Sequence, residues 1–402
     1  MDQGEQSIPT QLAISDFGYL QPPLKPSRPY HPQGVKCMRE VLLKELSNSD
    51  IDWMLTTGTK EEIAPGKVLI RQGEPVNALY ILLDGELLVS LSQPDNNPLG
   101  RAFAALEGGE MTGREIARLS SGDMVGEIPF LDTYLPSTTV KAVTKSVVLE
   151  IPQQQLATKL KEDISFAAHL YRASAILLSD RLEQIVSQLG HSTLVLSQPQ
   201  LREILFIFAE LRDSDIDWLV VAGTVSKVPA GTVLIQAGRP VEALHILLEG
   251  KLTLSASEDD RNPLARAFSS LEGGESPERE FARLSRGDIV GETPFIEAPP
   301  PSFSVKALED SWVLSIPQWR LAAKLLHDLP FAARFYRVLA VLLADKQRAI
   351  VSSLGYGRLS YSKDKSLDDS QEYENELSSD FLAQVALAGA RFDWMLKRIR
   401  RS

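Results

Sequence analysis

Few residues of this sequence have the types and spacing that chemistry needs. The five histidines, at 31, 169, 191, 245 and 327, are scattered and lack the short spacing of metal ligands. The sequence has neither a phosphate-cradling glycine loop nor a Gly-x-Ser-x-Gly nucleophile turn. The polar element that stands out is Gly-Asp-x-x-Gly-Glu, which ends at Glu127 and again at Glu292. A carboxylate there could cap a following helix. We therefore expect no enzyme active site, no metal site and no bound cofactor.

This element occurs twice because the chain contains an internal duplication. Residues 49–53, Ser-Asp-Ile-Asp-Trp, return as residues 214–218, an offset of 165 positions. Two covalently joined copies of one fold follow from this. We expect domains at residues 37–190 and 191–355. The same offset relates four further glycine pairs, which are Gly73 and Gly238, Gly85 and Gly250, Gly126 and Gly291, and Gly190 and Gly355.

The pattern within each copy predicts a small barrel flanked by helices. The first copy opens with a helical pattern at residues 41–46 and later has short apolar runs, at 68–70, 78–83 and 87–89, separated by glycine turns. It closes with a long pattern of helical period. That period is carried by Phe166, Leu170, Ala173 and Leu177, and in the second copy by Phe331, Phe335, Val338 and Leu342.

The glycine spacing and the Gly-Asp-x-x-Gly-Glu element together resemble the cyclic nucleotide-binding domain. The residues that carry the resemblance are Gly66, Gly73, residues 80–85 and 121–127 in the first copy, and Gly231, Gly238, residues 246–250 and 287–292 in the second. The resemblance implies a fold class that is mainly β with flanking α. It implies two tandem cyclic-nucleotide-binding-like β-barrels of the double-stranded β-helix, or jelly-roll, type, each with N- and C-terminal helices.

In that family a glutamate accepts a hydrogen bond from the ribose, and an arginine nine residues later pairs with the cyclic phosphate. The resemblance places the glutamates at Glu127 and Glu292, but the arginine positions hold Pro136 and Pro301. A buried phosphate that loses its charged partner loses roughly 2–5 kcal/mol of binding energy. Neither copy keeps a substitute arginine close by in the sequence. We therefore interpret both phosphate-binding cassettes, the segments that run from each glutamate to the following strand, as degenerate. The remnants of the nucleotide pocket are Gly126, Glu127, Ser137, Gly291, Glu292 and Ser302.

A long connection, residues 92–120 in the first copy, carries a sequence pattern of its own that the second copy shares. Such connections are often functional. One interpretation is a helical hairpin packed on its own barrel, and the other is a surface for a partner. The partner-binding candidates here are Arg101, Phe103, Arg114, Arg118, Arg266, Phe268, Arg279 and Arg283.

The flanks differ from the repeats. Residues 1–36 are proline-rich and predict an extended segment, and residues 356–380 predict an acidic flexible linker. Residues 381–402 predict an amphipathic helix, and within it the sequence of residues 392–396 resembles that of residues 51–55. Such a helix could bind another subunit or a partner, or fold back on its own chain, and its basic end could touch an anionic membrane. The candidates on this helix are Phe392, Trp394 and Met395.

The overall composition limits the function classes. The chain has 402 residues, a net charge of -11 and a single cysteine. An acidic surface repels phosphates, so we expect no nucleic-acid partner, and the lone Cys37 fits the cytoplasm. We predict a non-enzymatic scaffold or adaptor, or a structural subunit of a larger assembly, with a protein partner or its own oligomer. Two alternatives stay open: a sensor of a cyclic or other nucleotide with a remodelled pocket, and an accessory protein of the membrane surface.

Overall fold

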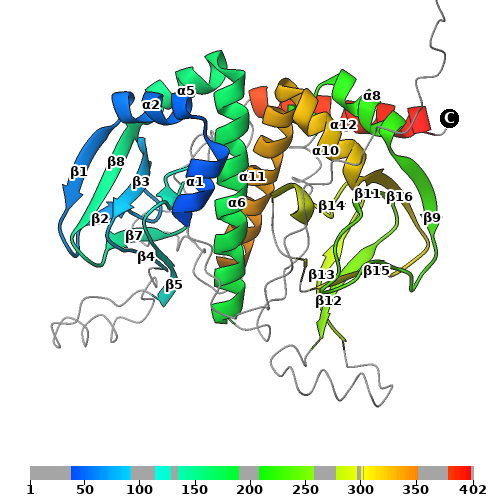
Figure 1. Cartoon of the computed structure of the whole chain (residues 1–402). Coiled ribbons are helices and arrows are strands. Elements are labelled where there is room, and N and C mark those ends of the chain that lie inside the picture. The colour runs from blue at the N-terminus through cyan, green and yellow to red at the C-terminus, as the bar shows by residue number, and fades with distance from the viewer. Residues whose placement is uncertain are drawn as a thin grey trace, which may run out of the picture. The chain divides into compact units, whose positions relative to one another are not determined.

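The chain contains the same series of helices and strands twice (Figure 1). The computed structural model describes residues 38–91, 114–127, 135–189, 208–257, 278–296, 300–301, 303–351 and 379–399. The first series, domain 1, is α1 (Met38–Glu45), α2 (Asn48–Thr57), β1 (Thr59–Ile63), β2 (Val68–Ile70), β3 (Ala78–Asp84), β4 (Leu87–Leu91), β5 (Arg114–Leu119), β6 (Met124–Val125), β7 (Thr139–Ala142), β8 (Ser146–Pro152), α5 (Gln153–Glu162) and α6 (Ile164–Leu189).

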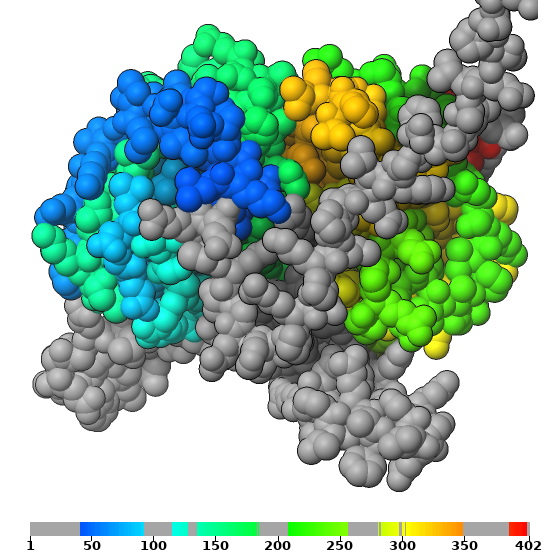
Figure 2. Space-filling view, in the orientation of Figure 1, coloured from blue at the N-terminus to red at the C-terminus, as the bar shows by residue number. Residues whose placement is uncertain are grey.

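Domain 2 repeats this order. Its elements are α8 (Asp213–Ala222), β9 (Thr224–Val228), β10 (Val233–Ile235), β11 (Ala243–Glu249), β12 (Leu252–Ser257), β13 (Glu278–Leu284), β14 (Ile289–Val290), the 3-10 helix η2 (Thr293–Ile296), β15 (Ser304–Ala307), β16 (Ser311–Pro317), α10 (Gln318–His327) and α11 (Leu329–Val351). A last helix, α12 (Ser379–Ile399), follows. In Figure 2 the surface of α1 and α2 is blue.

Each domain forms two four-stranded antiparallel sheets, which confirms the predicted mainly β fold. In domain 1 the orders are β1-β8-β3-β6 and β2-β7-β4-β5, and in domain 2 they are β9-β16-β11-β14 and β10-β15-β12-β13. Alternating apolar side chains point into the barrels, as the buried Leu87, Val89 and Leu91 of β4 illustrate. The barrel of domain 1 thus has its own apolar core, and so does that of domain 2.

Polar residues at the start of α2 and α8 fix the helices that open each barrel. The hydroxyl of Ser47 accepts a bond from the N–H of Asp50, whose carboxylate accepts one from the N–H of Ser47, a capping box. Asp50 is also bonded to His169 of α6, at 2.7 Å. In domain 2 the equivalent Asp215 receives two bonds from Arg334 of α11, at 2.8 and 2.9 Å. These buried aspartates connect the opening helix of each domain to its closing helix.

The two closing helices pack against each other within the compact unit Cys37–Ser402. One continuous apolar cluster contains buried residues of both, among them Leu177 of α6 and Leu342 of α11. The predicted helical faces are confirmed, since all eight residues that carried the period are buried. Gln347 of α11 donates a hydrogen bond of 2.7 Å to the carbonyl of Leu178 in α6.

The helical-hairpin prediction for the long connections is wrong where the structure describes them. Residues 114–119 form strand β5, paired with β4, and residues 278–284 form β13, paired with β12. Ile116 and Ala117 are consecutive and both buried, and the register with β4 shifts at this point, while Arg118 is exposed. The rest of each connection, with Arg101, Phe103, Arg266 and Phe268, lies outside the described residues.

Candidate ligand pocket

The element Gly-Asp-x-x-Gly-Glu brings Glu127 to the floor of the domain 1 barrel. Gly126 has a φ of 86° and passes so close to β3 that a Cβ atom would lie 2.4 Å from the carbonyl oxygen of Ala78. Gly291 repeats this geometry with a φ of 96° and the same distance to Ala243. Only glycine fits such an approach, because other residues rarely adopt this φ. The following glutamate is therefore set at the inner end of strand β6 or β14.

Glu127 is bonded to a cation of its own chain. The Nη1 atom of Arg181, on α6, donates a 2.7 Å hydrogen bond to the Glu127 carboxylate, and Nη2 donates to the carbonyl of Met124 at 2.8 Å. Glu127 is 2% exposed and Arg181 is 8% exposed. Charge-assisted bonds between such buried partners are strong. The carboxylate that the family uses for ribose is thus already occupied.

Domain 2 has the same arrangement with lysine in place of arginine. Lys346 of α11, at the position 165 residues after Arg181, lies 3.2 Å from the carboxylate of Glu292. Burial of Glu292 opposes its ionisation, but Lys346 and the N–H groups of Gly291 and Glu292 outweigh burial and lower its pKa. Glu292 directly precedes η2, and the groups seen to hold its carboxylate are Lys346 and the N–H groups of Gly291 and Glu292.

A buried aspartate completes the charge cluster of domain 1. Asp123 is 2% exposed and accepts a 2.8 Å hydrogen bond from the N–H of Ser120. Burial raises its pKa to about 6, although the Ser120 N–H and the charge of Arg181 act in the opposite direction. In domain 2 the equivalent Asp288 accepts a bond from the N–H of Ser285 at 2.7 Å. This aspartate therefore shapes the turn before the glutamate.

The prolines at the positions that the resemblance assigns to the arginine contribute backbone contacts, and Pro136 also lines the cavity described below. The carbonyl of Pro136 accepts a 2.9 Å bond from the N–H of Gly73, and that of Pro301 accepts a 2.8 Å bond from the N–H of Gly238. Both prolines are buried. A proline ring offers no hydrogen-bond donor to a phosphate. These contacts fix the backbone at the positions where the resemblance places the guanidinium.

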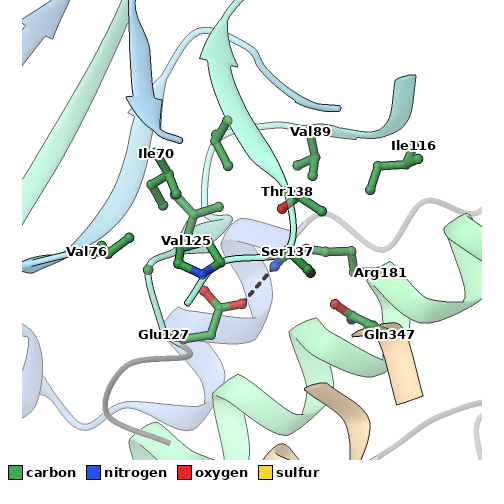
Figure 3. A pocket seen from close by; sticks show the side chains of 13 residues that line it. Ile70, Val76, Val89, Ile116, Val125, Glu127, Ser137, Thr138, Arg181 and Gln347 are labelled. Atoms are coloured by element: carbon green, nitrogen blue, oxygen red, sulfur yellow. Dashed lines mark hydrogen bonds and ion pairs between the residues drawn. The ribbon is translucent and has the colours of Figure 1, made fainter. Parts of the chain in front are cut away.

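The pocket of domain 1 is small and mainly apolar (Figure 3). Its cavity of about 40 Å³ has room for roughly three water molecules. Gln347 reaches it from α11, so domain 2 supplies part of the wall of the domain 1 pocket. The lining residues are Ile70, Val76, Val89, Ile116, Val125, Gly126, Glu127, Pro136, Ser137, Thr138, Val140, Arg181 and Gln347.

The structure brings some of the predicted site residues together. Gly126, Glu127 and Ser137 line the cavity, and Gly291 and Glu292 hold the same positions in domain 2, whereas Ser302 lies outside the described residues. The sequence analysis did not identify Arg181 and Lys346, because each lies 54 residues along the chain from the glutamate that it contacts. Arg181 is 54 residues from Glu127 and reaches it through the fold. The sequence does contain one signal for these cations. Asp-Arg at 180–181 corresponds to Asp-Lys at 345–346, so both copies have a cation at the same position of the repeat.

The remaining arginine candidates lie on strands at a distance from the pocket floor. Arg118 is exposed and bonds to Glu115 and Glu86 on its own sheet. The equivalent Arg283 bonds to Glu280. Arg114 is the first residue of β5, and Arg279 is the second residue of β13. The two described guanidinium groups are thus satisfied by neighbouring carboxylates.

The C-terminal helix α12 folds onto domain 2. Phe392 is 5% exposed and Met395 is fully buried, whereas Trp394 is 39% exposed. The similarity of residues 392–396 to residues 51–55 is therefore only partial in the structure. Trp53 and Trp218 pack against Phe166 and Phe331 of the closing helices, whereas Trp394 is 39% exposed. A membrane-surface role through the Phe392 face would require α12 to leave domain 2.

Two searches for other kinds of site are negative within the described ranges. In those ranges no helix is long and apolar enough to cross a bilayer. Nor does the described part of the chain hold a group of three or more His, Cys, Asp or Glu side chains placed to bind a metal ion.

Comparison with known proteins finds similarity to a curated protein and to solved structures. The protein named "Putative potassium channel protein RPA4233" of Rhodopseudomonas palustris is 30% identical over 129 residues, which cover 32% of this chain and 27% of that protein. The chain thus spans about a quarter of its relative's length. The regulatory domain of Toxoplasma gondii PKA with cAMP is 17% identical, with a TM-score of 0.26, covering 73% of this chain and 90% of that one.

A second solved structure is similar to a comparable share of the chain. The regulatory subunit of a cAMP-independent protein kinase A from Trypanosoma brucei is 16% identical, with a TM-score of 0.25, covering 70% of this chain and 85% of that one. The family match covers residues 60–163 and 225–328, just over half of the chain and one match for each barrel. Domains of this kind are regulatory and not catalytic. With its two barrels, each built around the Gly-Glu element, the chain belongs to the cyclic nucleotide-binding domain family.

Proposed function

We propose that the chain is a non-enzymatic scaffold or adaptor whose two domains no longer bind cyclic nucleotides. The observation that carries this proposal is the buried ion pair between Glu127 and Arg181. A ribose hydroxyl that displaced Arg181 would leave a guanidinium charge buried without its partner, a penalty of several kcal/mol. The pair of Glu292 with Lys346 supports the same conclusion for domain 2.

The phosphate end of the pocket supports the proposal independently. Pro136 and Pro301 stand where the resemblance places the phosphate-binding arginine, and the carbonyl of each accepts a hydrogen bond from a glycine N–H of the connection after β2 or β10. A cavity of about 40 Å³ also leaves little room for a nucleotide in domain 1. We propose that both cassettes are degenerate and that the domains, at residues 37–190 and 191–355, act through their surfaces on a protein partner or within an assembly.

A thermal-shift titration of the full chain tests this function. Cyclic AMP, cyclic GMP and cyclic dinucleotides are added up to about 1 mM, and we expect no change in the melting temperature. A site with a Kd of about 10 µM would gain about 2.7 kcal/mol at a hundredfold excess, or several degrees. A shift of that size in the unmodified chain would overturn the proposal.

A repaired variant provides the matched control. Pro136→Arg restores the phosphate partner, and Arg181→Met in the same chain releases Glu127. We expect the double variant to show a nucleotide-dependent shift that neither single variant reproduces in full. A positive result there demonstrates that the assay detects binding in this barrel.

A second candidate function is that of a sensor with a remodelled pocket, which one observation favours. The Nε atom of Arg181 is buried without a hydrogen-bond partner among the described residues, and the cavity also exposes Ser137 and Thr138. A cation beside two hydroxyl groups suits an anionic ligand. In that case the unmodified chain would be stabilised by a nucleotide, and Arg181→Met would abolish the effect.

A further inference from the structure

Helix α12 shows how a helix binds to the outer face of one of these domains. Phe392 stacks edge-on against Phe208, with ring centroids 5.1 Å apart. Arg391, beside it, donates to Asp213 at 2.8 Å and to the carbonyls of Phe208 and Ala209 at 2.9 and 3.1 Å. Met395, one turn further, is fully buried. The docked helix therefore presents an apolar ridge with an arginine at its edge.

The residues of α8 that receive α12 lie along one stripe of that helix. Asp213 pairs with Arg391, and Asp217 lies 3.6 Å from Arg398. Val220 continues the stripe, since positions i, i+4 and i+7 share one helix face, and it is packed against the apolar cluster that includes Phe392 and Met395. The receiving face of domain 2 thus includes Phe208, Asp213 and Asp217, and Val220 lies on the same side of α8 as the two aspartates.

Domain 1 has the same face, but its two apolar residues are exposed. At the repeat offset of 165, the four residues correspond to Leu43, Asn48, Asp52 and Leu55, which we call the domain 1 face. Leu43 is 60% exposed where Phe208 is fully buried, and Leu55 is 56% exposed where Val220 is partly buried. Figure 2 shows part of the surface of α1 and α2 in blue.

The equivalence of the two faces rests on contacts and not on sequence spacing alone. Glu45 of α1 forms an ion pair with Arg172 of α6, and Glu210 forms the corresponding pair with Arg337 of α11. The aspartates at 50 and 215 likewise bond to residues 169 and 334 of the closing helices. The opening helices of both domains are therefore held in the same register.

We propose that the domain 1 face binds an amphipathic helix of a partner protein, with the apolar and basic pattern of α12. The described residues include two such faces and a single α12, which is engaged on domain 2 by three hydrogen bonds of Arg391 and by the buried Phe392 and Met395. Asp52, the counterpart of Asp217, gives the face an acidic residue, and the chain carries a net charge of -11, so a helix with a basic edge is preferred. The proposal names a partner class for the scaffold and rests on that proposed function.

A peptide with the sequence of residues 379–402 is a direct probe of this face. It is labelled at its N-terminus and titrated with the full chain, and binding is followed by fluorescence anisotropy. We expect one peptide per chain with a Kd on the order of 10 µM, since the peptide must order as it binds. Leu43→Asp and Leu55→Asp should each weaken binding at least tenfold. Both residues are more than half exposed, so the variants should fold, which circular dichroism verifies.

Leu326→Asp is the matched control, because Leu326 is 75% exposed on α10 and the substitution adds the same charge elsewhere. It should leave the affinity unchanged. Absence of binding at the highest concentration would overturn the proposal. So would binding that Leu43→Asp and Leu55→Asp leave unaltered, which would place the peptide on domain 2 in exchange for α12. The nucleotide titration reports on the pocket and the peptide on the outer face, so the scaffold proposal and this one fail separately.

Discussion

The guanidinium of Arg181 lies 2.7 Å from the carboxylate of Glu127, although 54 residues separate them in the sequence. The pair joins the long closing helix to the floor of the barrel in domain 1. Its counterpart in domain 2, Lys346 with Glu292, is longer at 3.2 Å, and the side chain of Lys346 is 32% exposed. Both domains thus pair the glutamate with a cation of the closing helix, and the pair in domain 1 is shorter and more buried.

Arg181→Met should destabilise the chain strongly. The substitution leaves Glu127 buried without its cation, which typically costs about 3–5 kcal/mol. Lys346→Met should cost less than about 2 kcal/mol, because solvent screens the partly exposed lysine. Urea unfolding followed by circular dichroism measures both. The double variant Glu127→Gln with Arg181→Met should recover part of the loss, and equal losses in the two domains would contradict this account of the pair.

His245 should make domain 2 less stable in mild acid. Burial lowers its pKa from 6.5 to about 4, so the folded state stays neutral in a range where the unfolded chain takes up a proton. The contribution is therefore present above pH 6.5 and is lost as the pH falls towards 4, by on the order of 3 kcal/mol. Thermal melts between pH 4 and 7 measure it.

His245→Tyr gives domain 2 the residue that domain 1 has at Tyr80, and it should flatten this pH dependence. Asp123 acts in the opposite direction. Burial raises its pKa to about 6, so its contribution is present below pH 3.8 and is lost as the pH rises through 6. Because Asp123 is common to both chains, the difference between them isolates the histidine. Identical pH profiles would show that His245 titrates normally.

Gly126→Ala should destabilise domain 1 by more than its φ alone requires. Both Gly126 and Gly73 have positive φ angles, of 86° and 78°, which cost other residues about 1–2 kcal/mol. A Cβ at 126 would also meet the Ala78 carbonyl at 2.4 Å, whereas a Cβ at 73 would meet nothing within 4 Å. We expect Gly73→Ala to lose about 1 kcal/mol and Gly126→Ala clearly more in urea unfolding. Equal losses would remove the close approach as the reason for this glycine.

Phe392→Ala should loosen α12 from domain 2. The ring is 5% exposed and packs on Phe208, so its loss should cost about 3 kcal/mol. Trp394→Ala, two residues along, removes a side chain that is 39% exposed and should cost less than about 1 kcal/mol. Limited proteolysis is the measurement: cleavage within 379–399 should accelerate for Phe392→Ala and not for Trp394→Ala.

The fold could be predicted from the sequence because the duplication marked it twice. The glycine turns, the short apolar runs and the helical period of Phe166 to Leu177 each predicted an element that the structure contains. Prediction failed at residues 114–119, where Arg-Glu-Ile-Ala-Arg-Leu suits a helix or a strand in isolation. The partner strand β4 decides the outcome, and strand pairing is a tertiary effect that the local sequence does not contain.

The pocket could be predicted only in part. Glu127 and the prolines were evident from their spacing, but the cation that occupies the glutamate comes from a helix far along the chain. Gln347 could not be predicted as a pocket residue for the same reason, since it enters the domain 1 pocket from domain 2. Spatial partners of this kind are set by helix packing. The repeat offset that aligns Arg181 with Lys346 was the one sequence signal for them.

The packing of α6 against α11 has a consequence for the two copies as products of a duplication. The pocket of domain 1 is walled in part by Gln347 of domain 2, whose amide also bonds to the carbonyl of Leu178. A half-chain ending after α6 would lack that wall and would expose an apolar helix face to water. The two copies are therefore not equivalent, because domain 2 completes the pocket of domain 1. Separating them would yield two incomplete fragments and not two working single domains.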